Sequence, residues 1–196
     1  MIKKLEKMNI IKDAKMSNND MKIYFYGGAF NPLTISHQKI IDTIISDLSL
    51  NGCFDKNDIL HIGVTFHDYK NYEFDKYLRI KFVKEYMDSK YLDKFGWEVS
   101  FQDERTWNYL HKVYADDAQK YITLIMGQDE YDDLKVGKWH QSDDILNTYN
   151  IKVIPRTDGV SSSKVRELIK NKQFNEVKKY VSDKTFDILK AEGYVE

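Results

Sequence analysis

Short β-rich runs alternate with segments of helical periodicity along most of this chain, and that alternation restricts the possible folds more than any other feature. The clearest run is Tyr121–Met126, which is apolar almost throughout. Such a run is typical of a parallel strand that is buried on both faces of a sheet. On similar grounds we predict four further strands, at Met21–Tyr26, Ile59–Thr65, Trp97–Phe101 and Ile151–Pro155.

Segments with helical spacing lie between these runs. After Pro32 the apolar residues that recur at this spacing are Ile40, Ile41, Ile44, Ile45 and Leu48, and Asn51-Gly52 is expected to end the helix. A second helix is predicted over Asp75–Lys90, with candidate core residues Tyr77, Ile80, Phe82, Val83 and Met87. A third is predicted over Thr106–Ala115, and the chain from Ser161 onward is expected to be helical.

Strands that alternate with helices predict an α/β fold: a Rossmann-like, doubly wound parallel sheet of five to six strands with helices on both faces. We expect one domain over residues 21–196, with residues 160–196 forming a small helical portion. Residues 1–20 are polar and read as an N-terminal extension, helical at most. In such sheets ligands bind beyond the carboxyl ends of the strands, where the strand order reverses.

Composition excludes several classes of function. The formal charge is −1, from 30 basic and 31 acidic side chains, whereas proteins that bind nucleic acid usually carry a basic excess. No apolar run approaches the roughly 20 residues that span a bilayer, so we expect no membrane association and a cytoplasmic location. Cys53 is the only cysteine, which rules out an intrachain disulfide and a cysteine zinc cluster. The sequence leaves the oligomeric state open, a homo-oligomer included.

The segment from Gly27 to His37 follows the first predicted strand and opens a helix. Paired glycines allow a tight turn and a close approach of the backbone to a ligand, and Pro32 delays the start of the helix. Thr34 can cap that helix, whose amides form an anion site, and His37 lies on the same face one turn later. A hydroxyl and an imidazole at a helix N-terminus suit a triphosphate. The same residues are also compatible with an ordinary turn, a helix cap and a histidine on the surface.

Two further segments carry polar groups that suit a nucleotide. Val160–Arg166 places three serines before a helix and an arginine one turn into it, a combination that suits polyphosphate oxygens. Asp129 follows the fourth predicted strand, where a carboxylate can accept ribose hydroxyls, and Trp139 offers a flat face to a heteroaromatic ring. Helix capping and core packing are the ordinary alternatives for these residues.

Together these segments resemble signatures of the HxGH nucleotidyltransferase superfamily. Gly27–His37 resembles its GGxFxPxxxxH form with Thr34 in place of the first histidine, and Val160–Arg166 resembles its ISSTxIR signature. The stretch from Gly127 through Asp129 and Trp139 to Leu146 is similar to the GxD…W…IL segment of bacterial nicotinate mononucleotide adenylyltransferases. The segments around Arg79 and over Arg105–Leu110, and the ending near Gly193-Tyr194, also resemble that family.

The resemblance implies roles for individual residues. It implies catalysis by His37, Arg166 and Thr34. It implies ATP binding by Gly27, Gly28, Ala29, Phe30, Thr34, His37, Gly127, Asp129, Ser161, Ser162, Ser163 and Arg166. It implies contacts to the acceptor nucleotide by Asn31, Thr106 and Trp139, with Thr106 near the nicotinate and Trp139 stacked on the pyridine ring, and Lys70 is a further candidate for this set. No protein ligand to a metal is expected, because Mg²⁺ would arrive bound to ATP.

The chain departs from that family at three places. Ser36 stands where glycine is usual, so its β-carbon would crowd the nucleotide. The family's PPHK loop after the second strand is replaced by Thr65–Lys70, in which His67 or Lys70 would have to supply the missing cation. The segment between Pro155 and Val160 is short, which predicts a more open mononucleotide site.

The implied reaction transfers AMP from ATP to nicotinate mononucleotide and releases pyrophosphate, as a step of NAD biosynthesis. His37 and Arg166 would neutralise the charge that develops, assisted by Thr34 and the helix amides. Three alternatives stay open at this point. They are another acceptor in the same superfamily (nicotinamide mononucleotide or phosphopantetheine), cytidylyl transfer, which gives the GxD…W segment no role, and a nucleotide-binding module without catalysis.

Overall fold

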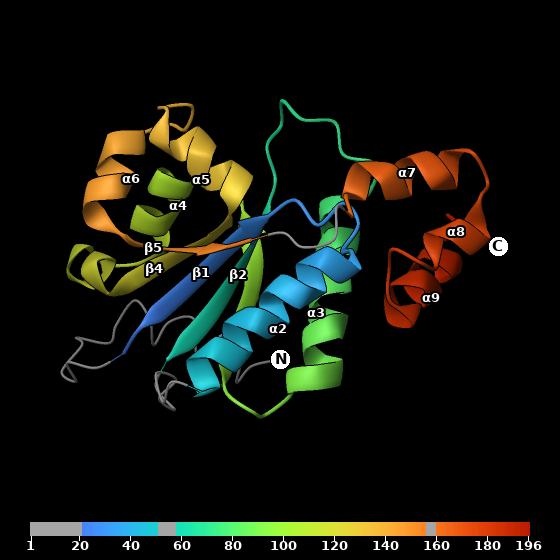
Figure 1. The fold of residues 1–196 in the computed structure, drawn as a ribbon, viewed down its shortest axis with the longest axis horizontal. Coiled ribbons are helices and arrows are strands. Elements are labelled where there is room, and N and C mark those ends of the chain that lie inside the picture. The colour runs from blue at the N-terminus through green and yellow to red at the C-terminus, as the bar shows by residue number, and fades with distance from the viewer. Residues whose placement is uncertain (1–20, 51–57, 156–159) are drawn as a thin grey trace.

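A parallel sheet forms the centre of the protein. The computed structural model describes residues 21–50, 58–155 and 160–196. Within them the strands are β1 (Ile23–Gly28), β2 (Ile59–Thr65), β3 (Gly96–Gln102), β4 (Ile122–Gly127) and β5 (Asn150–Ile154). Their order is β3-β2-β1-β4-β5 and every neighbouring pair is parallel, as Figure 1 shows. The strand order therefore reverses between β1 and β4, and the predicted α/β class is confirmed.

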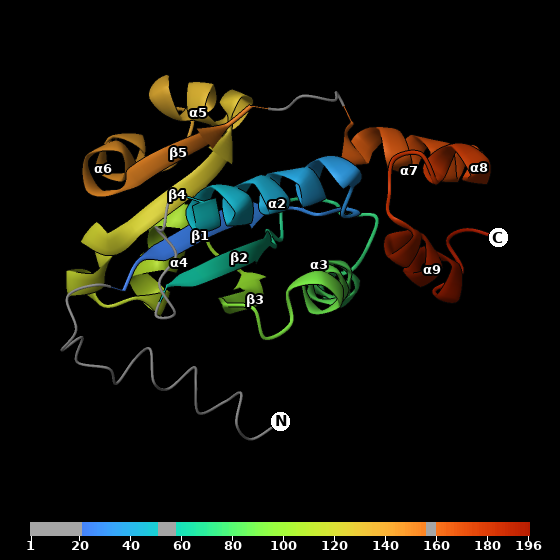
Figure 2. The same ribbon diagram turned by 60° about the horizontal axis from the view of Figure 1, so that its bottom comes forward.

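Helices cover both faces of the sheet (Figure 2). The helical elements are α2 (Ile35–Leu50), α3 (Lys76–Tyr91), α4 (Thr106–Val113), the 3₁₀ helix η1 (Asp116–Tyr121), α5 (Gln128–Lys135), α6 (Ser142–Thr148), α7 (Ser162–Lys170), α8 (Phe174–Val177) and α9 (Asp183–Ala191). The helices α2 and α3 share one hydrophobic cluster with the C-terminal helices. A second cluster joins α4, α5 and α6 to the inner strands β1 and β4. Among the described residues, no helix combines the length and apolar character that crossing a bilayer requires.

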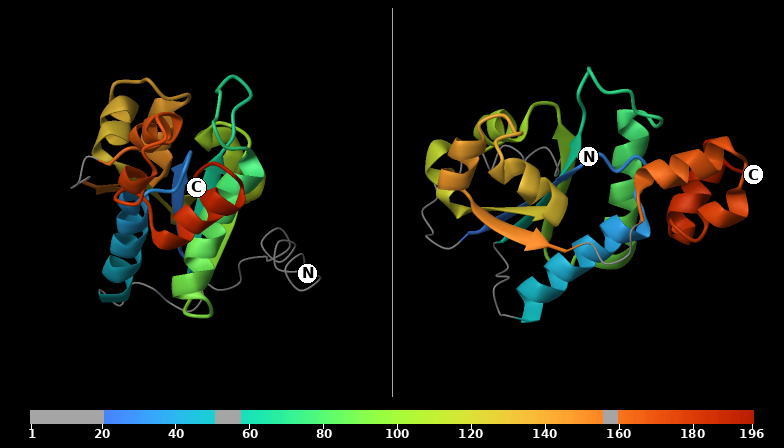
Figure 3. Two further views of the ribbon diagram at one scale, coloured as in Figure 1. Left: turned by 90° about the vertical axis from the view of Figure 1, so that its right-hand side faces the viewer. Right: turned by 45° about the horizontal axis from the view of Figure 1, so that its top comes forward.

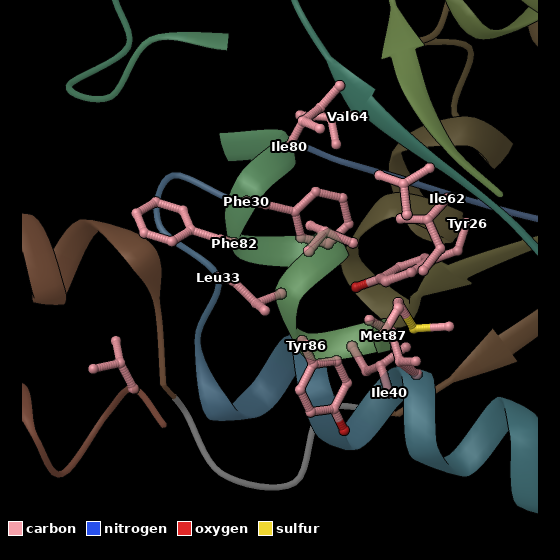
Figure 4. Close-up of a cluster of buried hydrophobic side chains, with 14 of the residues drawn as sticks. Tyr26, Phe30, Leu33, Ile40, Ile62, Val64, Ile80, Phe82, Tyr86 and Met87 are labelled. Atoms are coloured by element: carbon pink, nitrogen blue, oxygen red, sulfur yellow. The ribbon is translucent and has the colours of Figure 1, made fainter. Parts of the chain in front are cut away.

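The larger cluster is built from the predicted isoleucines of α2 and the apolar face of α3. Figure 4 shows part of it, including Tyr26, Phe30, Leu33, Ile40, Ile62, Val64, Ile80, Phe82, Tyr86 and Met87. The prediction that Tyr77 belongs to this core is wrong, because its side chain is 68% exposed. Arg79 and Leu78 occupy the buried face of that turn instead, and Tyr77 lies edge-on to Phe101 at the surface.

Several element boundaries were also predicted correctly or nearly so. The second strand has the predicted bounds, Ile59–Thr65, and the other four strands are displaced by one or two residues. The short helices α5 and α6 were not predicted, because seven or eight mostly polar residues give little periodicity. Some expectations concern residues outside those that the structure describes. These are the expectations for residues 1–20, the helix end at 51–52, Cys53, the short segment at 156–159 and the side chain of Leu48.

A buried histidine lies in the amino half of β2. His61 on β2 is fully buried, and its ring nitrogens contact the hydroxyls of Tyr114, Ser100 and Tyr109. Burial lowers the pKa of His61 from 6.5 to about 4 because desolvation penalises the charged ring. The imidazole is therefore neutral at pH 7 and binds its hydroxyl partners without a charge.

This shift predicts a pH-dependent stability. The unfolded chain binds a proton at His61 below about pH 6.5 and the folded chain only near pH 4, so the free energy of unfolding should fall as the pH drops through that window. The contribution of this one proton is about 1.4 kcal/mol per pH unit. Urea unfolding at several pH values should show it in the wild type, and a His61→Gln variant should lack it. Identical pH slopes for the two proteins would contradict this explanation.

Candidate active site

The turn after β1 depends on two glycines. A β-carbon on Gly28 would lie 2.8 Å from the ring of Phe30, and one on Gly27 would lie 2.9 Å from Oε1 of Gln102. Phe30 has a positive φ of 46°, which turns its ring back over the end of the strand into the core, where it is fully buried. Its ring meets His37 edge-on, with 5.2 Å between the centroids. Phe30 therefore shapes the turn and supports His37, and only its backbone is placed to meet a ligand.

Thr34 fixes the orientation of His37. The Thr34 amide donates to Nδ1 of His37 at 3.1 Å, and the Thr34 hydroxyl lies 2.9 Å from the same atom. Because a backbone amide can only donate, Nδ1 must accept, so the ring proton of the neutral imidazole is on Nε2. Thr34 itself is fully buried. It can therefore act on a ligand only through His37, which presents a defined hydrogen-bond donor.

The start of α7 is attached to this turn. Ser162 donates to the Pro32 carbonyl oxygen at 2.9 Å, and Arg166 donates to the Asn31 carbonyl oxygen at 2.7 Å. A second guanidinium nitrogen of Arg166 donates to Ser163 Oγ at 2.9 Å. Figure 3 shows α7 set against the beginning of α2. Two sequence motifs 130 residues apart therefore meet at one place, as the sequence predicted.

The chain after α8 holds α2 from the same side. The Ile35 amide donates to the Tyr180 carbonyl oxygen at 3.0 Å, and Gln38 Nε2 donates to Ser182 Oγ at 2.9 Å. The amides of Thr34 and Ile35 are thus engaged within the protein. The expected anion site made of helix amides loses these two donors, and the imidazole of His37 becomes the principal group that this helix start can offer.

Two cavities meet above the carboxyl ends of the strands. The Trp139 cavity, of about 490 Å³, is lined among others by Gly27, Thr106 and Trp139. The Arg166 cavity, of about 440 Å³, is lined among others by His37 and Arg166. Ala29 and Lys70 line both. The two cavities are therefore contiguous, and their junction lies beside the turn that follows β1.

The predicted site residues divide between these cavities. The Trp139 cavity contains Gly27, Gly28, Ala29, Lys70, Thr106 and Trp139. The Arg166 cavity contains Ala29, Asn31, His37, Lys70, Ser161, Ser162, Ser163 and Arg166. Gly127 and the exposed Asp129 lie at the carboxyl end of β4 but line neither cavity. Glu130 lines the Trp139 cavity instead, and its carboxylate accepts the Gly127 amide at 3.0 Å.

Two of these side chains, Asn31 and Ser161, have a visible structural task. Asn31 is 4% exposed, and its Oδ1 accepts the Phe74 amide at 3.1 Å, which anchors the chain before α3. Ser161 caps α7 by accepting the Lys164 amide at 3.2 Å. Ser36, where the sequence predicted crowding of the nucleotide, is 6% exposed and lines the Arg166 cavity.

Arg79 was not predicted as a site residue, although it supports both loops. It is fully buried on α3, and one guanidinium nitrogen donates to the carbonyl oxygens of Ala29 at 2.9 Å and Thr65 at 2.7 Å. Its Nε donates to the Phe74 carbonyl oxygen at 3.1 Å, and the guanidinium stacks on the ring of Tyr72 at 3.8 Å. An arginine inside an apolar helical face is the sequence signal that could have identified it.

The loop after β2 carries the cations that the sequence proposed as substitutes. In Figure 1 this loop rises above the sheet. Burial and the nearby charges of Lys70 and Arg105 lower the pKa of His67 below its usual value, while Asp68 raises it. The ring of His67 stacks on Tyr69 at 5.2 Å. Lys70, which lines both cavities, is therefore the better source of positive charge at the junction. Among the described residues, no cluster of three or more metal-ligating side chains occurs.

Comparisons with known proteins agree on one family. Residues 25–182 match the cytidylyltransferase-like family. A curated relative from Fusobacterium nucleatum, described as a "probable nicotinate-nucleotide adenylyltransferase", is 30% identical over 157 residues, which is 78% of this chain and 77% of the relative.

Solved structures share the fold. Plasmodium falciparum nicotinic acid mononucleotide adenylyltransferase complexed with APC has a TM-score of 0.62 at 18% identity, with 88% of this chain and 96% of that chain covered. The same enzyme complexed with NaAD has a TM-score of 0.61 at 19% identity, with 89% and 97% covered. At these identities the likeness concerns the arrangement of the elements only.

Proposed function

The chain belongs to the cytidylyltransferase-like family, and from that membership we propose that it transfers AMP from ATP to nicotinate mononucleotide. The products are deamido-NAD and pyrophosphate, and the reaction is a step of NAD biosynthesis. The name of the family refers to cytidylyl transfer, whereas the 30% identical relative is named for adenylyl transfer to a nicotinate nucleotide. Because the relative matches this chain over most of its length, its name favours ATP over CTP as the nucleotide donor.

The observation that carries the proposal is the junction of the two cavities. ATP would place its phosphates in the Arg166 cavity, and the acceptor would occupy the Trp139 cavity with its pyridine ring against Trp139. The acceptor phosphate then reaches the α-phosphate at the junction beside Ala29 and Lys70. Two substrates bound in contiguous cavities are held for reaction, which removes much of the entropic barrier.

The chemistry is a single displacement at phosphorus. A phosphate oxygen of nicotinate mononucleotide attacks the α-phosphorus, and the bond from that phosphorus to the bridging oxygen of the β-phosphate breaks. The electron pair leaves with pyrophosphate. No nucleophile from the protein is needed, so the enzyme acts by alignment and by charge stabilisation.

Residues of the Arg166 cavity suit this task. His37 would donate Nε2–H to an oxygen of the α-phosphate, in the tautomer that Thr34 fixes. Arg166 would pair with the departing pyrophosphate, exchanging its present contact with the Asn31 carbonyl oxygen for charged oxygens. Ser163 and Ser161 lie beside it as hydroxyl donors. Lys70 would neutralise the attacking phosphate at the junction.

Two remaining roles concern the ribose and the metal. Asp129 is exposed at the carboxyl end of β4 and would accept ribose hydroxyls of ATP, together with the backbone at Gly127. Mg²⁺ would arrive as the MgATP complex.

A pyrophosphate-release assay tests the proposal directly. Wild-type protein with MgATP should release one pyrophosphate for each deamido-NAD formed when nicotinate mononucleotide is the acceptor. Parallel reactions with nicotinamide mononucleotide and with phosphopantetheine identify the acceptor class. Tight ATP binding with no pyrophosphate release from any acceptor would show a nucleotide-binding module without catalysis, and release with phosphopantetheine alone would overturn the pyridine acceptor.

A further inference from the structure

Arg105 stands out among the charged residues of the Trp139 cavity. Lys138 pairs with Asp133 at 2.7 Å, and the Glu130 carboxylate accepts the Gly127 amide. Within residues 21–50, 58–155 and 160–196, the Arg105 guanidinium has no hydrogen-bond or ion-pair partner. Arg105 therefore lines a cavity in which the carboxylate of Glu130 is engaged by the Gly127 amide rather than by the guanidinium.

A buried glutamine fixes the turn that presents Arg105. Gln102 is 2% exposed, and its Nε2 donates to the Glu104 carbonyl oxygen at 3.3 Å and to Thr106 Oγ1 at 3.1 Å. These two contacts hold the residues on either side of Arg105. The backbone of Arg105 then continues directly into α4, because its carbonyl oxygen accepts the Tyr109 amide at 2.9 Å. The side chain is thus carried by a rigid turn rather than by a free loop.

The same contacts set the hydrogen-bond polarity of Thr106. The Glu104 carbonyl oxygen only accepts, so the nitrogen of the Gln102 amide must face it and Thr106 Oγ1. The Thr106 hydroxyl accepts from Gln102, which leaves its own proton to donate. Gln102 Oε1 is buried beside the glycine backbone of β1 and β2 and has no hydrogen-bond partner among the described residues. This wall of the cavity therefore offers donors, a hydroxyl and a guanidinium.

We propose that Arg105 selects nicotinate over nicotinamide mononucleotide by pairing with the carboxylate of the pyridine ring. This assignment rests on the proposed function. The acceptor phosphate is common to both nucleotides and belongs at the junction, which Lys70 lines and Arg105 does not. Arg105 lies with Thr106 and Trp139 on the other side, where the base is placed. A carboxylate accepts from both donors of the wall, whereas the amino group of a carboxamide finds only donors there.

Steady-state kinetics with both acceptors at saturating MgATP tests this assignment. Arg105→Ala should lower the ratio of kcat/KM for nicotinate over nicotinamide mononucleotide about tenfold, through a higher KM for the nicotinate form. Lys70→Ala should weaken both acceptors by similar factors, because it meets the shared phosphate. Lys112→Ala is the matched control, since Lys112 is an exposed cation on α4, the helix that follows Arg105, pairs with Asp103 and Glu104 and lines neither cavity.

The outcomes separate this inference from the function on which it rests. A wild type that uses neither acceptor overturns both. If the wild type is active and Arg105→Ala lowers kcat/KM equally for the two acceptors, Arg105 serves the phosphate and the inference is wrong. An unchanged ratio and unchanged KM values would show that Arg105 is an ordinary surface residue. Thermal unfolding of each variant verifies that the fold is retained, as expected for an exposed side chain.

Discussion

Replacing His37 with alanine should lower kcat by roughly two to four orders of magnitude while the fold stays intact. The imidazole lies in the Arg166 cavity, oriented by the Thr34 amide and hydroxyl so that Nε2 carries the proton. A donor that is already oriented stabilises charge in the transition state without reorganisation. Because the loss concerns the transition state, we expect the KM for ATP to change much less than kcat.

The measurement is initial-rate pyrophosphate release, combined with circular dichroism and thermal unfolding. His111→Ala is a matched control, because this histidine packs on Trp107 at 4.1 Å and lines neither cavity. Its turnover should stay near that of the wild type. Near wild-type turnover in His37→Ala would remove His37 from the mechanism, and an unfolded His37→Ala protein would show that the ring acts in folding through its contact with Phe30.

Replacing Arg79 with methionine should destabilise the protein by about 3 kcal/mol or more and strongly reduce activity. Methionine fills much of the buried volume but cannot donate to the three carbonyl oxygens that Arg79 now satisfies, those of Ala29, Thr65 and Phe74. The turn after β1 and the loop after β2 would lose their common anchor. Both loops contribute residues to the junction of the cavities, so the effect on kcat/KM should exceed what partial unfolding explains.

Urea unfolding and steady-state kinetics on the same preparations measure the two effects. Lys81→Met is the matched control on the same helix, because its ion pair with Glu192 is exposed and contributes little. Arg79→Lys should be intermediate, since an ammonium keeps the charge but lacks the planar fork that reaches several carbonyls. Wild-type stability and activity in Arg79→Met would contradict the role of an anchor.

The sheet could be predicted from the sequence because each strand had a local signal. Ile59–Thr65 and Tyr121–Met126 are apolar runs that only a buried strand accommodates, and β2 has the predicted bounds. The meeting of the Gly27–His37 and Ser161–Arg166 segments was also foreseeable, from resemblance rather than from pattern. Their contact through Ser162 and Pro32 is present.

Other features depend on tertiary contacts that leave no mark in local sequence. Tyr77 has the composition of a core residue, but the turn of α3 places Arg79 inside and Tyr77 outside. The engagement of the Ile35 amide by Tyr180 joins residues 145 positions apart and could not be read from either segment. The donor polarity of Thr106 likewise depends on how one buried glutamine amide is oriented. The roles assigned to the site residues are still predictions.

The attachment of α7 to the turn after β1 has a consequence for how this protein folds during its own synthesis on the ribosome. The contacts of Ser162 with Pro32 and of Arg166 with Asn31 close loops of 130 and 135 residues. Long-range closure of this kind is slow compared with local helix formation. While the ribosome is still translating the segment before α7, the emerging chain already contains the Gly27–His37 turn but none of the Arg166 side of the cavity. The Arg166 side of the cavity should therefore form only after the C-terminal helices have emerged from the exit tunnel.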